Sequence, residues 1–222
     1  MSQTLPLFPL GTVLFPGLLL PLHIFEERYR RLVRDLLAGA APRRFGVIAI
    51  REGRETGADG IRSLYEVGCI ATLRRVTEHE DGRFDLVAAG TQRFGLAELD
   101  DSQPYLRGEV DILAEDTGDQ AAARIAARAV QQGFRTYLDA LARRGAAQPG
   151  IPGLPDEPVP LSYLVAASMI IDLPDRQVLL AAPDALHRLT AERALLARET
   201  TMLRSLTSAP APDLRYSPYN PN

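Results

Sequence analysis

Apolar and polar residues alternate with a period of two through much of the first half of the chain. The alternation is clearest at residues 106–112, where Leu, Gly, Val and Ile alternate with charged residues, and residues 44–50 form a compact apolar run. A period of two is typical of strands with one buried face. Asp81 and Gly82 favour a tight hairpin turn between two such strands. Residues 5–114 therefore predict several short strands in a small, strongly bent barrel or sandwich.

Residues 25–38 interrupt the strands with a helical pattern. Acidic Glu26 and Glu27 fall in the first turn, where they complement the partial positive charge of a helix N-terminus. Gly39 suits the end of such a helix. The apolar positions recur at intervals of three and four, at Tyr29, Leu32, Val33, Leu36 and Leu37.

After Thr117 the apolar residues recur at helical spacing. A long amphipathic helix is predicted up to Gly145, with Val130, Phe134 and Tyr137 on its apolar side. Residues 145–160 contain five prolines, so this segment predicts a surface loop inside the helical part.

Three further helical segments follow this loop. Residues 161–173 predict a short helix that is apolar on nearly all sides and that stops at Pro174. Asp175 can cap a short helix over residues 176–182. Residues 184–206 predict a final helix whose leucine stripe must pack against another element.

This change of pattern divides the chain into two parts and predicts an α+β fold. Residues 1–117 are expected to form a β-barrel subdomain and residues 118–208 a helical subdomain. Residues 209–222 are rich in proline, so a disordered tail is expected.

Composition places the chain among ordinary globular proteins and argues against a polyanionic partner. Of its 222 residues, 46% are hydrophobic and 24% are charged, values close to the globular average. All 25 basic residues are arginine, because the sequence has no lysine. Up to Thr117 there are 14 arginines and 18 acidic residues, and after it 11 and 10, which gives net charges of −4 and +1. Neither part has the basic surplus that neutralises phosphates, so no nucleic-acid partner is expected.

The apolar N-terminal stretch lacks the features of a targeting or membrane segment. No basic residue precedes Arg28, which argues against a signal peptide, and four prolines between residues 5 and 25 argue against a spanning helix. Cys69 is the sole cysteine and lies in an apolar run, which predicts a buried thiol without a disulfide. We therefore expect a cytoplasmic protein without a membrane partner.

The absence of lysine excludes several reaction types. A nucleotide-binding P-loop, a Ser-Lys protease dyad and Schiff-base chemistry each require a lysine. The GxGxxG fingerprint of dinucleotide-binding proteins is also missing from the sequence. The sequence therefore predicts no cofactor and no enzyme of these classes.

Three histidines and one thiol remain as candidates for chemistry. His23, His79 and His187 show neither HxxxH nor HExxH spacing, and no serine lies in a GxSxG motif. Because the chain has a single cysteine and widely spaced histidines, the sequence predicts no metal site. A small hydrolase that uses a histidine or Cys69 stays open as an alternative function.

Several segments, taken in order, resemble the N-terminal substrate-binding domain of Lon-type proteases. Residues 5–29 (LPLFPLGTVLFPGLLLPLHIFEERY) contain the apolar first strand, the proline-glycine turn and the FE and RY pairs of that family. The resemblance covers roughly residues 5–206. Shorter matches lie at residues 45–47, 67–71, 81–83, 90–94 and 104–105, and looser ones at 161–173, 177, 179–180 and 188–189.

The resemblance implies a PUA-like β-barrel followed by a helical bundle, and a role in binding proteins. In full-length Lon proteases this region helps to recognise unfolded or tagged substrates, while separate domains hydrolyse ATP and cut peptide bonds. We therefore expect a non-catalytic module that binds unfolded or tagged protein segments and that could act with a protease in trans. A groove between barrel and helices is the expected binding place, with no residue singled out. The PUA-like barrel leaves RNA binding as a second alternative, against which the acidic first part argues.

Overall fold

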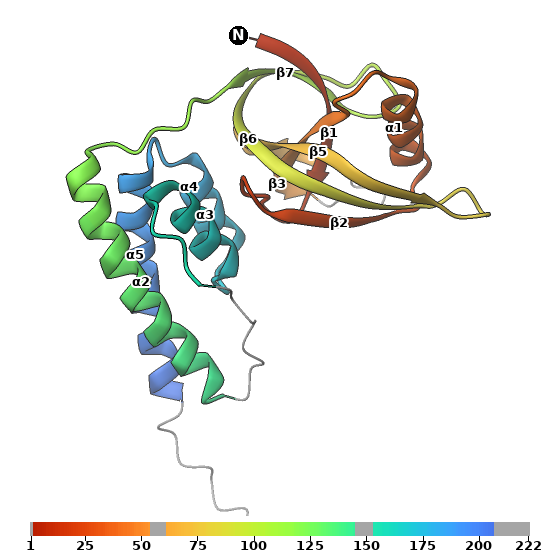
Figure 1. Cartoon of the computed structure of the whole chain (residues 1–222). Helices are drawn as coiled ribbons and strands as arrows, with labels where there is room; N and C mark the ends of the chain where they lie inside the picture. The colour runs from red at the N-terminus through yellow and green to blue at the C-terminus, as the bar shows by residue number, and fades with distance from the viewer. Residues whose placement is uncertain (1, 54–60, 145–152, 207–222) are drawn as a thin grey trace, which may run out of the picture.

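The computed structural model describes residues 2–53, 61–144 and 153–206, which form a β-barrel followed by helices (Figure 1). The predicted α+β class is confirmed. The strands are β1 (Ser2–Leu10), β2 (Leu19–Ile24), β3 (Arg44–Gly53), β4 (Ile61–Leu64), β5 (Val67–Glu78), β6 (Phe84–Asp100) and β7 (Arg107–Ile112). The helices are α1 (Glu27–Ala38), α2 (Gln120–Ala142), α3 (Pro158–Ser168), α4 (Leu173–Ala181) and α5 (Ala185–Leu206).

Five strands close the barrel because β1 has a partner on each side. It runs antiparallel to β7 and parallel to β3, which completes the ring β1-β7-β6-β5-β3. The 17-residue β6 contributes twice, since its first half pairs with β2 and its second half with β7. Register shifts in the pairings of β6 with β5 and β7 bend the strands, as β-bulges do at the corners of small barrels. In the described residues, β2 and β4 each pair with a single strand and so lie at edges.

Glycines let the barrel close tightly around Phe94, which is fully buried. A methyl group on Gly68 would collide with the Phe94 ring and lie 2.6 Å from the carbonyl oxygen of Val47. A methyl group on Gly46 would lie 2.7 Å from the Leu7 side chain. Two of the short motifs noted above, at residues 45–47 and 67–71, thus place glycines where the barrel has no room for a side chain.

Local signals in the first part predicted their elements closely. Helix α1 begins at Glu27, two residues later than predicted, and its C-cap is Gly39, the predicted stop. The hairpin between β5 and β6 turns at the Asp81-Gly82 pair, where Gly82 has a φ of 75°. A left-handed residue at this point is the usual solution for a hairpin loop of this length, and glycine adopts it without strain.

The prediction that a helix stops at Pro174 is wrong. Helix α3 ends at Ser168, and Pro174 is instead the second residue of α4. Helix α3 likewise begins at Pro158, inside the segment predicted as loop. Proline is compatible with the first turn of a helix because the N–H groups there have no partner within the helix. Residues 145–152 of that loop and the tail 209–222 fall outside the described residues, and residues 153–157 precede α3 without regular secondary structure.

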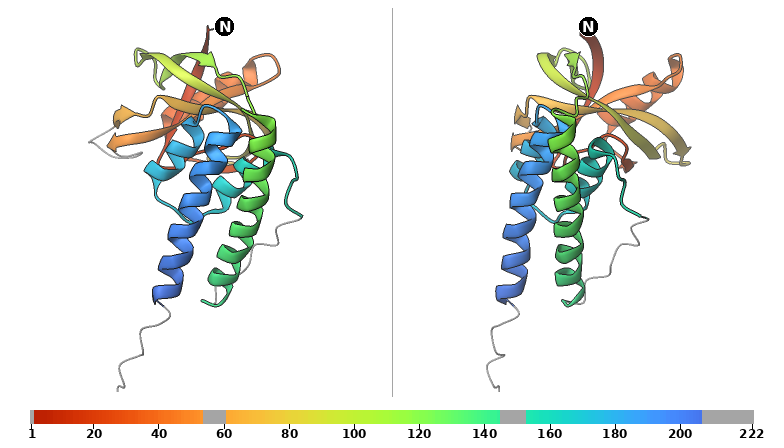
Figure 2. Two further views of the ribbon diagram at one scale, coloured as in Figure 1. Left: turned by 90° about the vertical axis from the view of Figure 1, so that its left-hand side faces the viewer. Right: turned by 60° about the vertical axis from the view of Figure 1, so that its left-hand side comes forward.

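Helices α2 and α5 run side by side in the same direction, and α3 and α4 lie between this pair and the barrel (Figures 1 and 2). The backbone N–H of Ala185 donates to the carbonyl oxygen of Asp116 at 2.9 Å, which joins the two helix starts. Within the described residues, none of the helices combines the length and the apolar character needed to cross a bilayer.

A shared hydrophobic core joins the two parts of the chain. Val13, Phe15 and Ala49 from the barrel belong to the same buried cluster as Tyr163 and Leu180 from the helices. This core contains residues from both sides of residue 117, so the division of the chain into two subdomains at that point stays a prediction.

Candidate functional site

Arg93 stands at the centre of the junction where a groove was expected. Its side chain is 2% exposed, and its guanidinium donates to the carbonyl oxygens of Leu180, at 2.9 Å, and Ala182 at the end of α4. It also forms a 2.8 Å ion pair with Glu115. Since successive residues of a strand point to opposite faces, Phe94 fills the barrel while Arg93 caps a helix of the bundle.

Tyr163 and Arg188 extend this buried polar network. The Tyr163 hydroxyl donates to Glu115 at 2.6 Å, and the Arg188 guanidinium lies 3.9 Å from the centre of the Tyr163 ring. Arg188 is fully buried and donates to the hydroxyls of Ser162 and Tyr163 and to the Leu179 carbonyl. Burial raises the pKa of Tyr163, so the phenol stays a neutral donor. The centre of the predicted groove is therefore filled by side chains that hold the fold together.

Glu192 lies one helical turn beyond Arg188 and is fully buried. Neither carboxyl oxygen has a hydrogen-bond partner among the described residues. Burial raises the pKa of Glu192 well above its ordinary value, and the positive charge of Arg188 opposes this only in part. An unpaired carboxylate is costly in such surroundings, so the neutral acid is favoured.

Cys69 does not meet the requirements of a nucleophile. The side chain is fully buried, and burial raises the pKa of the thiol to about 12. A nucleophilic cysteine needs an accessible thiolate, which a cationic neighbour or a helix N-terminus usually stabilises. The expected buried thiol is confirmed.

The three histidines form hydrogen bonds with carboxylates. His187 Nδ1 lies 2.8 Å from Asp184, while His23 Nδ1 and His79 Nε2 each lie 2.7 Å from a different oxygen of Asp85. Within the described residues, no hydrogen bond joins any of these rings to a serine or cysteine, so the pairs lack the nucleophile of a hydrolase. His23 and His79 are adjacent in space although 56 positions separate them in the sequence.

A groove beside β4 is a candidate for binding that combines a strand edge with exposed apolar side chains. It has a volume of about 330 Å³, within the usual range for ligand sites. All four residues of β4 line it, and neighbouring side chains in a strand point to opposite faces. The hollow therefore lies along the edge of the strand. We name it the β4 groove; its lining residues are Arg28, Ile61, Arg62, Ser63, Leu64, Leu96, Leu99, Asp101 and Leu106.

The β4 groove combines apolar side chains with hydrogen-bonding capacity. Leu99 is 45% exposed although it lies in a strand. The Ser63 hydroxyl is buried and has no hydrogen-bond partner among the described residues. Arg28 and Arg62 contribute two positive charges and Asp101 one negative charge. The sequence pattern missed this site, because β4 is four residues long and shows no clear alternation.

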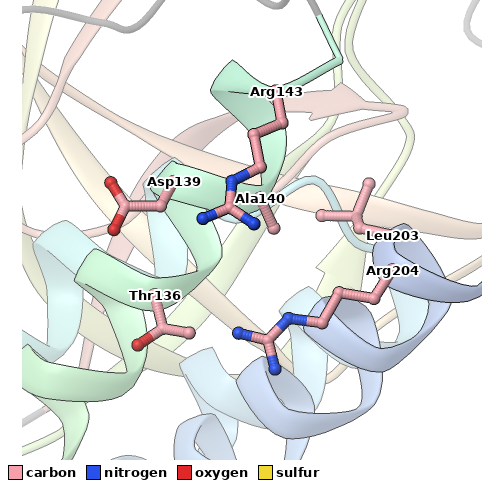
Figure 3. A pocket seen from close by; sticks show the side chains of 6 residues that line it. All are labelled: Thr136, Asp139, Ala140, Arg143, Leu203 and Arg204. Atoms are coloured by element: carbon pink, nitrogen blue, oxygen red, sulfur yellow. The ribbon is translucent and has the colours of Figure 1, made fainter. Parts of the chain in front are cut away.

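Other hollows lie among the described residues, and two along α2, of about 450 and 500 Å³, are larger than the β4 groove. A smaller one lies between the far ends of α2 and α5, where Arg143 and Arg204 extend into it beside Thr136 and Asp139 (Figure 3). It is polar and has a volume of about 90 Å³, too small for a peptide side-chain cluster. Another, of about 170 Å³, lies next to Phe25.

Comparison with known proteins identifies the fold and the family. Residues 4–198 match the model of the ATP-dependent protease La (LON) substrate-binding domain. The structure is similar to the crystal structure of a Lon N-terminal domain protein from Xanthomonas campestris, with a TM-score of 0.59 and 26% identity over 88% of this chain and 98% of that one. It is also similar to the N-terminal domain of Lon protease from the Mycobacterium avium complex, with a TM-score of 0.62 and 16% identity over 90% and 98% of the two chains.

Curated relatives are considerably longer than this chain. A Lon protease from Azorhizobium caulinodans is 23% identical over 91% of this chain but over 24% of its own length. A Lon protease from Parabacteroides distasonis is 35% identical over 52% of this chain and 14% of its own length. The family model covers most of the chain, and two solved Lon N-terminal domains share its fold. The chain therefore belongs to the Lon substrate-binding domain family.

Proposed function

We propose that this chain is a non-catalytic protein-binding module that holds extended, apolar segments of unfolded or tagged proteins in the β4 groove. Membership of the Lon substrate-binding domain family supports a protein substrate. The observation that carries the proposal is an apolar hollow of about 330 Å³ along a strand edge. The inert thiol at Cys69 supports a role in binding, as do the histidines, which form no hydrogen bond to a serine or cysteine within the described parts of the chain.

The geometry fits a segment bound in an extended conformation. An edge strand presents unpaired backbone N–H and C=O groups, so a peptide can add to the sheet through main-chain hydrogen bonds. Its alternate side chains then contact Leu64, Leu96 and Leu99. Main-chain pairing is independent of sequence, and the leucines select apolar residues. This combination suits the recognition of many unfolded proteins.

Cleavage of a bound segment is assigned to a protease that receives it in trans. The P-loop and Ser-Lys chemistry of Lon proteases requires lysine, which is absent from this sequence. We place the module in the cytoplasm, and we propose no nucleic-acid partner because neither part of the chain has a strongly positive net charge.

A substitution that places a negative charge in the β4 groove tests the proposal. Leu99→Asp puts a charge into the apolar floor and should weaken binding of a fluorescently labelled unfolded peptide about tenfold or more, since the contact of one leucine is worth roughly 1.5 kcal/mol or more when fully buried. Ile125→Asp is the matched control, because Ile125 is an exposed apolar residue (71%) on α2. Fluorescence anisotropy measures both affinities.

Equal affinities of the two variants would contradict the location of the site. Failure of the wild-type chain to bind any unfolded peptide would contradict the function itself. A peptide with N-methyl groups at alternate backbone amides adds a second readout. This peptide should bind much more weakly when the methyl groups replace the amide hydrogens that face β4. Unchanged affinity would show that side chains alone hold the segment.

A further inference from the structure

His23, His79 and Asp85 form a compact cluster on the surface of the barrel. Asp85 accepts from His23 with one carboxylate oxygen and from His79 with the other, each at 2.7 Å. The ring centres of the two histidines are 6.3 Å apart. One nitrogen of each ring therefore points at the same carboxylate.

Three separate segments of the sheet bring these residues together. His23 lies in β2 directly opposite Asp85 of β6, and His79 follows β5 at the start of the hairpin turn. The pairing of β6 with both β2 and β5 fixes the backbone positions. The three side chains are 49%, 41% and 53% exposed, so they can adjust their rotamers and an ion can reach them from solvent.

We propose that His23, His79 and Asp85 form a binding site for a divalent transition-metal ion of the Zn²⁺ class. Two imidazole nitrogens and one carboxylate are the protein ligands of many open zinc sites, in which water fills the remaining position. The three ligand atoms lie within 4.8 Å of one another. Around a tetrahedral Zn²⁺ such atoms lie about 2.0 Å from the ion and about 3.4 Å apart. Small rotations of exposed side chains close this gap.

The local charges favour a cation at this place. The Asp85 side chain places an acidic group between the two imidazole rings. The neighbouring Arg83 is paired with Asp81 at 2.6 Å, which compensates its positive charge. An ion would replace the two hydrogen bonds of Asp85 by metal bonds and so link β2 to the β5–β6 hairpin.

This site is independent of the β4 groove, since none of its three residues lines that hollow. The bound ion has no part in the proposed capture of peptides. It acts on the fold by tying an edge strand to a hairpin. Because the ion binds the folded chain, its effect on stability grows with metal concentration.

Isothermal titration of the full chain, without a histidine tag, with ZnCl₂ tests the proposal. The wild type should bind one Zn²⁺ per chain. His23→Ala, His79→Ala and Asp85→Asn should each weaken binding at least about tenfold, since even the loss of an outer partner of a metal ligand costs about that much. His187→Ala is the matched control, because His187 pairs with Asp184 in the same way but has no third ligand near it in the part of the chain that the structure describes.

Absorption spectra with Co²⁺ give a second readout. Co²⁺ bound by two histidines and a carboxylate shows visible d–d bands, and these should disappear in Asp85→Asn and persist in His187→Ala. Thermal unfolding without metal checks that each variant is folded, and Zn²⁺ should raise the Tm of the wild type and of His187→Ala alone. Absence of saturable Zn²⁺ binding by the wild type would overturn the proposal. An equal loss of Zn²⁺ affinity in His187→Ala and in the variants of His23, His79 and Asp85 would overturn it as well.

Discussion

Arg93 in β6 donates a 2.9 Å hydrogen bond to the carbonyl oxygen of Leu180 at the end of α4. This bond joins the barrel to the helical bundle through a side chain that is 2% exposed. The same guanidinium pairs with Glu115, on the segment that connects the two parts. One strand residue thus holds the end of a helix, the connecting segment and the barrel in a fixed relation.

Replacement of Arg93 should therefore destabilise the whole fold. Arg93→Met removes the guanidinium, so that Glu115 loses its ion pair and two helix-end carbonyls lose their donor, a loss of about 3 kcal/mol or more. Urea unfolding followed by circular dichroism measures it. The control is Arg83→Met, since Arg83 forms an exposed pair with Asp81 and should change the midpoint little. Similar midpoints for the two variants would show that the junction is held mainly by the apolar core.

Glu192 should make stability fall as pH rises. Its raised pKa means that the folded chain keeps a proton which the unfolded chain releases above a pKa of about 4.5. Because the folded state then binds more protons, the free energy of unfolding decreases with pH by up to about 1.4 kcal/mol per pH unit until Glu192 ionises in the folded state. Glu192→Gln removes this decline, so the free energy of unfolding of the variant should increase relative to that of the wild type between pH 5 and 7.5.

Urea titrations at several pH values measure this difference. The control is Glu98→Gln, which replaces an exposed carboxyl and should leave the pH dependence of the wild type unchanged. A wild-type stability that rises with pH over this interval to the same degree as that of Glu192→Gln would contradict the neutral, buried form of Glu192.

Gly68 and Gly95 lie on neighbouring strands and should respond differently to alanine. Gly68→Ala forces a methyl group against the Phe94 ring and the Val47 carbonyl, so a loss of about 1–3 kcal/mol is expected from overpacking. At Gly95 the nearest atom, on Leu113, would lie 3.9 Å away, an ordinary contact. Differential scanning calorimetry should show a lower Tm for Gly68→Ala than for Gly95→Ala, and the reverse order would refute the packing argument.

The Cys69 thiol should be unreactive in the native chain. Burial and a pKa of about 12 leave almost no accessible thiolate at pH 8. Ellman's reagent should therefore modify one thiol per chain in denaturant and almost none without it. Rapid labelling of the folded chain would contradict the buried position and reopen the hydrolase alternative.

Features carried by neighbouring residues were predictable without a structure. The stripe after Glu27, the stop at Gly39 and the turn at Gly82 each depend on atoms within a few residues, so the local sequence suffices. The Pro174 error also has a local cause. A proline can follow the end of one helix or lie in the first turn of the next. Because α3 already ends at Ser168, Pro174 lies in the first turn of α4.

The sequence by itself determined the α+β order, the family resemblance and the absence of lysine-dependent chemistry, because each of these resides in residue type and short-range spacing. The tertiary structure decided the rest. Parallel pairing of β1 with β3 closes the barrel. Packing of the helices against the barrel lets Arg93 of β6 cap the end of α4. Strand register places His23 beside Asp85. Such contacts join residues tens of positions apart, and their existence depends on which strands pair and in which register, a choice made by the packing of the whole chain.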